Sequence, residues 1–239
     1  MKKKQIEFIG ISFLILLLWS SLSLYSGQEI RPVTVDMPMP DFTLPAYQGG
    51  EVSLSDLKGK NILLIFPRGL AAENNWCHVC PYQYMELVEF DKKIDLRKKY
   101  NVEILFVLPY KKSKVAEWVK NFPDLLADIE NWKHPEHPEK LDKQEKQRME
   151  MAHKYFPKDF TYEKGEVPFP FPILMDTKQK VSKGLEIFTT EWSGSSVEQN
   201  IPTILIVDEQ GLVQFKYISQ KTFDRPSPEY LTEILSCIQ

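Results

Sequence analysis

Cysteine is scarce in this sequence, with 3 residues among 239. A fold held together by disulfides would carry more cysteines, in even number. The charge balance does not suggest binding to nucleic acid either, since 30 lysines and arginines stand against 33 acidic residues. The sequence has no internal repeat. Hydrophobic residues make up 43%, which is enough for the core of a globular domain and excludes extensive disorder.

The N-terminal region contains an uncharged apolar stretch from Phe8 to Tyr25, preceded by lysines at positions 2–4. This length just suffices to cross a bilayer as a helix. We therefore predict a single transmembrane anchor at residues 8–27, after a cytoplasmic tail at residues 1–7. Lysines stay in the cytoplasm, so the remaining chain is expected on the extracytoplasmic (periplasmic) side of the cell membrane. A cleaved signal peptide is the alternative, although residues 23–26 form a poor cleavage site.

Beyond a short linker expected at residues 28–37, the pattern predicts an α/β domain at residues 38–239. Two continuous apolar runs, 61–66 and 102–108, have the appearance of buried central strands. Residues 204–207 and 213–218 predict a hairpin across Asp208-Glu209-Gln210-Gly211. A further strand is expected at residues 173–176. Helices are expected at residues 77–100, 113–122 and 178–188, and from Pro228 onward. This order predicts a sheet covered on both faces.

One segment, at about residues 123–170, does not fit this alternation. It holds a charged helix, expected from Glu139 to about Phe156, with only a thin apolar stripe. An aromatic and proline-rich run at residues 167–172 follows it. We interpret the segment as a helical insertion packed on the surface of the domain.

Two of the three cysteines form the close pair Cys77-His78-Val79-Cys80, between a predicted strand and a predicted helix. Unpaired backbone N–H groups and the helix dipole stabilise a thiolate at a helix N-terminus, which makes Cys77 the expected nucleophile. Cys80 lies one turn later and could resolve a mixed disulfide. In an oxidising compartment this pair must be reduced by a partner, or it acts as a disulfide.

Other residues could support the pair. A protonated His78 or the side chain of Arg68 would stabilise the thiolate, although His78 could instead point to solvent and Arg68 could be a surface arginine. Trp76 is expected beside the pair, or in ordinary loop packing. Cys237 is expected as a small apolar residue of the last helix, with a role as distant resolving cysteine as the alternative.

A metal site is the competing interpretation of the pair. Structural zinc takes four ligands, usually in two close pairs, and the other pair is His134-x-x-His137, which is interrupted by prolines. Some membrane-anchored proteins that deliver copper bind it through a Cys-x-x-x-Cys spacing and a histidine, and this chain lacks that spacing. We therefore expect no metal and no cofactor, and keep a copper chaperone or a structural binding module as the less favoured alternative.

Several segments of the sequence together resemble a known family. The segments 39–44, 52–60 and 61–66, followed by Trp76-Cys77-x-x-Cys80, resemble the redoxin branch of the thioredoxin-like superfamily. This branch includes the AhpC/TSA (peroxiredoxin-like) proteins and membrane-anchored thiol–disulfide oxidoreductases. Ile201-Pro202-Thr203 resembles the cis-proline loop of thioredoxins. The resemblance implies a thioredoxin-like fold with a central mixed sheet, a redox-active centre at Cys77 and Cys80, and substrate contacts from Ile201 and Pro202.

The sequence departs from peroxiredoxins at their defining positions. Their loop Pro-x-x-x-Thr-x-x-Cys would place proline and threonine where this chain has Leu70 and Asn74. Their late arginine is replaced by Ile201-Pro202. We therefore expect an extracytoplasmic thiol–disulfide oxidoreductase that acts on protein disulfides or dithiols and takes electrons from a membrane or extracytoplasmic reductant. A peroxiredoxin-like peroxidase with antioxidant activity is the alternative.

Overall fold

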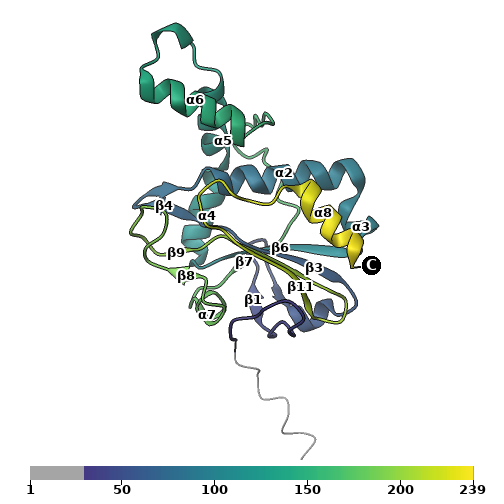
Figure 1. Ribbon diagram of the computed structural model, residues 1–239. Helices are drawn as coiled ribbons and strands as arrows, with labels where there is room; N and C mark the ends of the chain where they lie inside the picture. Colours follow the sequence, from purple (N-terminus) through teal and green to yellow (C-terminus); the bar gives the residue numbers. More distant parts are fainter. Residues whose placement is uncertain (1–29, 239) are drawn as a thin grey trace, which may run out of the picture.

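The structure, a computed structural model, describes residues 30–238 and centres on a five-stranded mixed sheet. The strands lie in the order β11-β10-β3-β6-β7 (Figure 1). Their bounds are β3 (Asn61–Phe66), β6 (Val102–Leu108), β7 (Ile173–Met175), β10 (Thr203–Val207) and β11 (Val213–Ile218). β6 runs parallel to β3 and β7, whereas β10 is antiparallel to β3 and β11. The predicted mixed sheet and the predicted hairpin are confirmed.

The central strands β3 and β6 are covered on both faces. Every residue of β3 is buried, as its continuous apolar sequence predicts. Alternate side chains enter two separate cores, with Leu63 and Ile65 on one face and Ile62 and Leu64 on the other. The first core is completed by α2 (Val79–Ile94), α4 (Lys112–Lys120), α5 (Phe122–Lys133) and α8 (Pro228–Cys237). The second is closed by the β1–β2 hairpin (Thr43–Pro45, Glu51–Ser53) and α7 (Lys180–Gly184).

The helix after the cysteines is shorter than predicted. Asp95 adopts a left-handed conformation with φ 54°, which ends α2 and separates it from α3 (Leu96–Lys99). The Asp91 carboxylate accepts hydrogen bonds from the backbone N–H and from Nε of Arg97, and thereby holds this corner. The predicted single helix over residues 77–100 is therefore two helices.

The predicted insertion contributes to the main core as well as to the surface. Helix α5 buries Phe122, Leu126 and Ile129 in the first core. After η3 (Pro138–Lys140), helix α6 (Lys143–Tyr155) packs on α5 and projects from the body of the molecule (Figure 1). A capping box between Asp142 and Glu145 starts α6 four residues later than predicted.

Helix α7 is also shorter than the predicted 178–188. Glu186 has φ 57°, and Phe188–Thr189 forms strand β8, which pairs with β9 (Gln199–Asn200). At its end, Gly184 lies so close to the N-terminal segment that a Cβ there would meet the Ile30 carbonyl oxygen at 2.5 Å. The glycine thus permits the close approach of two segments that are distant in sequence.

The N-terminal part of the domain begins earlier than residue 38. Val33 is buried, and the N–H of Asp36 donates to the Val213 carbonyl at 2.8 Å. Residues 33–37 therefore pack on β11 instead of forming a free linker. The predicted anchor at residues 8–27 lies outside the described residues. Within residues 30–238, no helix is long and apolar enough to span a membrane.

Candidate active site

The cysteine pair follows a small hairpin at the carboxyl end of β3. Strands β4 (Leu70–Ala72) and β5 (Asn75–Trp76) form this hairpin within the segment that the sequence presented as an irregular loop. Asn74 makes its turn with φ 61°. The chain then returns to the end of β3, where the Cys77 N–H donates to the Gly69 carbonyl at 2.9 Å. This hydrogen bond fixes Cys77 just before the first turn of α2.

Cys77 and Cys80 lie together as free thiols, both buried. The Cys80 thiol donates a hydrogen bond to Cys77, and this bond is the main cause that lowers the pKa of Cys77 from 9.0 to about 6. The charges of Arg225 and Arg68 and the Val79 N–H lower this pKa further, against the effect of burial. Burial, together with the bond to Cys77, raises the pKa of Cys80. The geometry therefore separates a thiolate at Cys77 from a protonated thiol at Cys80.

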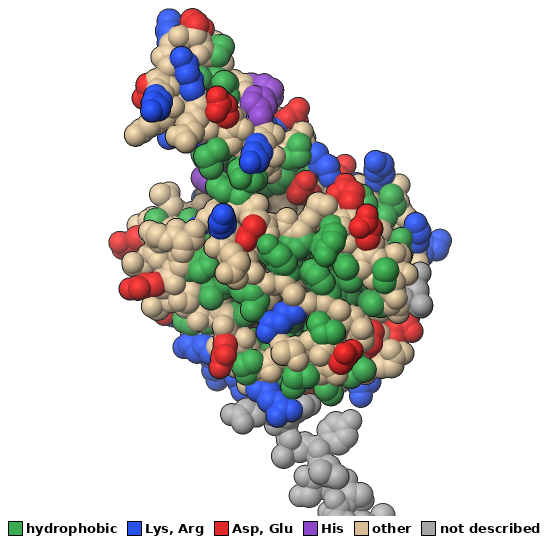
Figure 2. All heavy atoms as spheres, viewed as in Figure 1, with side chains coloured by type: hydrophobic (Ala, Val, Ile, Leu, Met, Phe, Trp, Pro, Cys, Tyr) green, Lys and Arg blue, Asp and Glu red, His purple; other side chains and the backbone are tan. Residues whose placement is uncertain are grey.

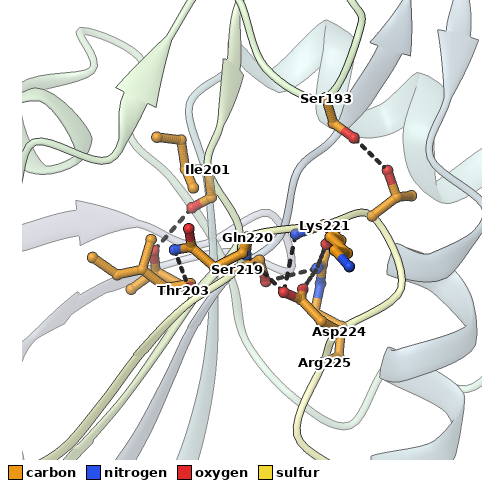
Figure 3. A network of polar contacts seen from close by, with 10 residues as sticks. Ser193, Ile201, Thr203, Ser219, Gln220, Lys221, Asp224 and Arg225 are labelled. Atoms are coloured by element: carbon orange, nitrogen blue, oxygen red, sulfur yellow. Dashed lines mark hydrogen bonds and ion pairs between the residues drawn. The ribbon is translucent and has the colours of Figure 1, made fainter.

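Arg225, on the loop between β11 and α8, was not predicted from the sequence. Its side chain is 7% exposed, and Nη1 donates to Ser219 Oγ at 2.7 Å, to the Lys221 carbonyl and to Asp224 (Figure 3). Its Nε and Nη2 have no hydrogen-bond partner among the described residues. Burial lowers the pKa of Arg225, and the cysteines oppose this effect. The loop thus brings a buried positive charge to the cysteine pair.

Arg68 is also buried, which excludes the interpretation as a surface arginine. Its Nε donates to Gln199 Oε1 at 2.7 Å, and its Nη2 donates to Ser195 Oγ and the Trp192 carbonyl. The guanidinium carbons of Arg68 and Arg225 lie 5.0 and 5.9 Å from the centre of the Trp192 ring. Arg68 therefore has a fixed position from which its charge reaches Cys77.

Trp76 is 4% exposed and forms a wall of the hairpin next to Cys77. Its ring meets Tyr110 edge-on at 5.7 Å, and its Nε1 donates to Glu117 at 3.3 Å. The Tyr110 hydroxyl donates to the Glu198 carbonyl and accepts from the Leu70 N–H. Trp76 thus belongs to a packed aromatic layer that holds the hairpin against the loop after β8.

His78 contacts helix α5. Its Nε2 is 3.1 Å from Asp128 Oδ2, and its ring packs on Trp132 with 4.5 Å between ring centres. Both partners belong to α5. His78 is not among the groups that lower the pKa of Cys77, so its predicted support of the thiolate is not seen in this geometry.

The segment Ile201-Pro202 departs from the cis-proline loop that it resembles. The described residues contain no cis peptide bond, so the bond before Pro202 is trans. The Ile201 N–H donates to the Ile187 carbonyl, and the Pro202 carbonyl accepts from the Ser219 N–H at 2.9 Å. These backbone groups are therefore engaged within the domain. The adjacent Asn200 N–H donates to the Arg68 carbonyl, which ties the segment to the end of β3.

Two other candidates for functional chemistry, an acidic cluster with a histidine and the third cysteine, lack the features of a site. Ligand atoms of Glu130, His134 and Asp159 lie within 4.8 Å of one another. However, the buried ammonium of Lys133 already sits among them, 2.9 Å from Glu130 and 2.5 Å from Asp159. This cation fills the place that a metal ion would need. Cys237 is exposed near the end of α8, which disfavours a role as resolving cysteine beside a buried pair.

A comparison with protein families finds a match over the segment that holds the cysteine pair. Residues 35–131, which include both cysteines of the pair, match the model of the AhpC/TSA family. None of the curated proteins matches the sequence significantly. The match supports the predicted thioredoxin-like redoxin assignment. It confirms the prediction of a thiol-dependent redox enzyme, either an oxidoreductase or a peroxidase.

Three solved structures are similar to this chain at low sequence identity. A mutant of peroxiredoxin 6 from Arenicola marina aligns with TM-score 0.51 and 14% identity, over 86% of this chain and 72% of that chain. A reduced 2-Cys peroxiredoxin from Plasmodium vivax gives 0.49 and 20%, over 87% and 83%. A mitochondrial 2-Cys peroxiredoxin from Plasmodium falciparum gives 0.49 and 18%, over 86% and 92%. The likeness to the Arenicola marina protein shows the fold alone.

Proposed function

We propose that the protein is a thiol–disulfide oxidoreductase in which Cys77 attacks and Cys80 resolves. The Cys77 thiolate attacks one sulfur of a substrate disulfide, and the other substrate sulfur leaves as a thiolate and takes up a proton. Cys80 then loses its proton and attacks the Cys77 sulfur, which releases the second substrate thiol. The substrate gains two electrons, and the protein becomes the Cys77–Cys80 disulfide. The reverse sequence oxidises a substrate dithiol.

The observation that carries this proposal is the position of two buried free thiols at the start of α2, with the pKa of Cys77 lowered and that of Cys80 raised. A nucleophile with a pKa of about 6 is ionised at neutral pH. A resolving thiol that stays protonated does not compete with it for the substrate. Oxidation to the Cys77–Cys80 disulfide removes both thiols at once.

A peroxidase is the second candidate, favoured by the burial of Cys77. Cys77 is 2% exposed, so a small oxidant reaches it with less rearrangement than a protein disulfide needs. The peroxide O–O bond would break on attack by the thiolate, giving a sulfenic acid at Cys77 and, with a proton, an alcohol or water. The Cys80 thiol would then condense with the sulfenic acid and release water.

Rapid mixing separates the two candidates. The reduced full chain, solubilised in detergent, is mixed with insulin or with hydrogen peroxide while tryptophan fluorescence is followed. Fast oxidation by the protein disulfide that is absent in Cys77→Ser supports disulfide exchange. Fast oxidation by peroxide alone, also lost in Cys77→Ser, assigns the peroxidase. Rates like those of free cysteine with both reagents would contradict both candidates.

The cellular location is part of the same proposal. The lysines at positions 2–4 and the uncharged stretch from Phe8 to Tyr25 support a single membrane anchor with the redox domain outside the cytoplasm. Such a domain needs a membrane-bound or extracytoplasmic reductant. Protease added to intact spheroplasts should remove the domain and leave a short membrane-bound fragment. Protection of the domain from this protease would contradict the proposed orientation.

A further inference from the structure

An apolar groove lies between the projecting lobe, which comprises residues 134–156, and the body of the domain. Its cavity measures about 260 Å³. The walls come from Trp132 on α5, from Met151 and Ala152 on α6, from Phe156 directly after α6, and from Phe223 on the loop between β11 and α8. Arg148 is the charged residue of this lining. Figure 2 shows hydrophobic side chains gathered where the lobe meets the body.

The walls of this groove are held by aromatic contacts. Phe223 stacks on Tyr155 with 4.7 Å between ring centres, and its edge meets Phe156 at 5.9 Å. The Arg148 guanidinium carbon lies 5.9 Å from the centre of the Trp132 ring. The groove is therefore a packed feature that joins α5, α6 and the loop before α8.

Exposed apolar side chains lie beside the groove. Four large hydrophobic side chains within residues 30–238 are exposed by more than a third, namely Val35, Met151, Tyr155 and Tyr230. Two of them, Met151 and Tyr155, lie on α6 beside the groove. Apolar side chains gathered at a concave surface mark an interaction site more often than scattered ones do.

One contact and one shared loop relate the groove to the cysteine pair. Trp132 packs on His78, which directly follows Cys77. Phe223 belongs to the same loop as Arg225, whose charge lowers the pKa of Cys77. A chain whose disulfide reaches Cys77 therefore runs past this groove. Since Cys77 is 2% exposed, such a chain must move some of the residues that cover it.

The size and charge of the groove define its occupant. Sites for drug-sized ligands measure about 300–1,000 Å³, so this cavity suits one or two amino-acid side chains. The apolar walls favour an aromatic or long aliphatic residue, and Arg148 favours an acidic neighbour. We propose that the groove binds an extended segment of a partner polypeptide through an apolar anchor and an adjacent acidic residue, close to the disulfide that Cys77 attacks. This inference rests on the proposed disulfide exchange for its biological purpose.

Binding can be measured without thiol chemistry. The probe is fluorescently labelled, reduced and carboxymethylated α-lactalbumin, an unfolded polypeptide without free thiols, and the readout is its anisotropy with the full chain. Met151→Gln should weaken binding about fivefold, because a polar amide replaces an exposed apolar wall. The matched control Val35→Gln changes another exposed apolar residue and should bind like the wild type. Arg148→Gln should weaken binding and reduce its dependence on salt.

Several results would overturn the groove assignment. These are no binding by the wild-type chain, equal binding by Met151→Gln and Val35→Gln, or a groove that serves only self-association. The last would appear in sedimentation as a dimer that Met151→Gln dissociates, without binding of the probe. Cys77→Ser should bind the probe normally. Binding without any disulfide exchange would reject the proposed function and keep the groove, whereas exchange with no effect of Met151→Gln on probe binding would reject the groove alone.

Discussion

Arg225 supplies a buried positive charge to Cys77, although the two residues belong to opposite ends of the domain sequence. The guanidinium is held by Ser219 and Asp224 and leaves Nε and Nη2 without partners among the described residues. A buried arginine in this state is stabilised by a nearby anion, and the Cys77 thiolate provides one. The positive charge of Arg225, on the loop before α8, therefore favours the ionised form of Cys77.

Replacement of Arg225 should change the reactivity of Cys77. Arg225→Gln removes a charge that lowers the pKa of Cys77, so this pKa should rise and alkylation by iodoacetamide at pH 7 should slow by about twofold. Arg225→Lys should recover part of the rate. Lys221→Gln serves as the control, because the Lys221 side chain is exposed on the same loop and only its carbonyl contacts Arg225. Equal rates in Arg225→Gln and Lys221→Gln would contradict the assignment.

Cys80 should control the pKa of its neighbour through its hydrogen bond. The thiolate absorbance of Cys77 should titrate with a midpoint near pH 6, so reactivity falls below this pH and reaches a plateau above it. Cys80→Ala removes the donor and should move the midpoint toward 9.0. Cys80→Ser keeps a donor and should move it less. The titration is made in a Cys237→Ser background, and identical midpoints for the alanine and serine variants would show that the hydrogen bond has no such role.

Gly69 is required by the backbone that positions Cys77. It has φ 80°, and a Cβ at this position would meet the Tyr110 ring at 2.5 Å. Gly50 has a similar φ of 74° with nothing within 4 Å of a Cβ. Gly50→Ala should therefore cost about 1 kcal/mol of unfolding free energy through backbone strain alone, and Gly69→Ala about 2–4 kcal/mol. Chemical denaturation of both variants tests this difference, which equal losses would refute.

The stability of the domain should depend on pH through Glu86. Burial raises the pKa of Glu86 from 4.5 to about 7, with opposition from Lys158. A raised pKa means that the folded state favours the protonated form. The contribution is thus complete below pH 4.5 and is lost as the pH rises through 7. Glu86→Gln should consequently stabilise the domain at pH 8 by about 1–3 kcal/mol more than at pH 5.

Denaturant unfolding at the two pH values measures this effect. The control variant Glu150→Gln, on the exposed face of α6, should show no such difference. If Glu86→Gln and Glu150→Gln shift the unfolding free energy equally at both pH values, the raised pKa of Glu86 is wrong.

The sequence predicts best the elements whose environment is uniform. β3 is buried on both faces, so its continuous apolar run indicates a central strand without reference to the rest of the chain. The cysteine pair lies between a strand and a helix as predicted, because both elements have local sequence signals, whereas its catalytic role stays a prediction. Arg68 was among the candidate residues, but the sequence could not show whether its side chain is buried.

Features that depend on contacts between distant segments were missed or misjudged. Arg225 lies in a loop without a motif, and its role arises from the return of that loop to the cysteines. For His78 the sequence left open support of the thiolate or exposure to solvent, and the structure instead supplies Asp128 and Trp132 of α5 as its partners. The peptide bond before Pro202 is trans, and the Pro202 carbonyl accepts a hydrogen bond from the Ser219 N–H. Local pattern carries no information on these tertiary competitors.

The attacking cysteine is the central claim, and trapping it is the most direct measurement. Cys80→Ser, which lacks the resolving thiol, is mixed with an excess of insulin, and the disulfide-linked product is digested and sequenced by mass spectrometry. The account predicts a stable mixed disulfide at Cys77, and for the oxidised wild type an internal Cys77–Cys80 disulfide. A mixed disulfide at Cys237, or one that forms at Cys80 in Cys77→Ser as fast as the wild type reacts, would contradict it.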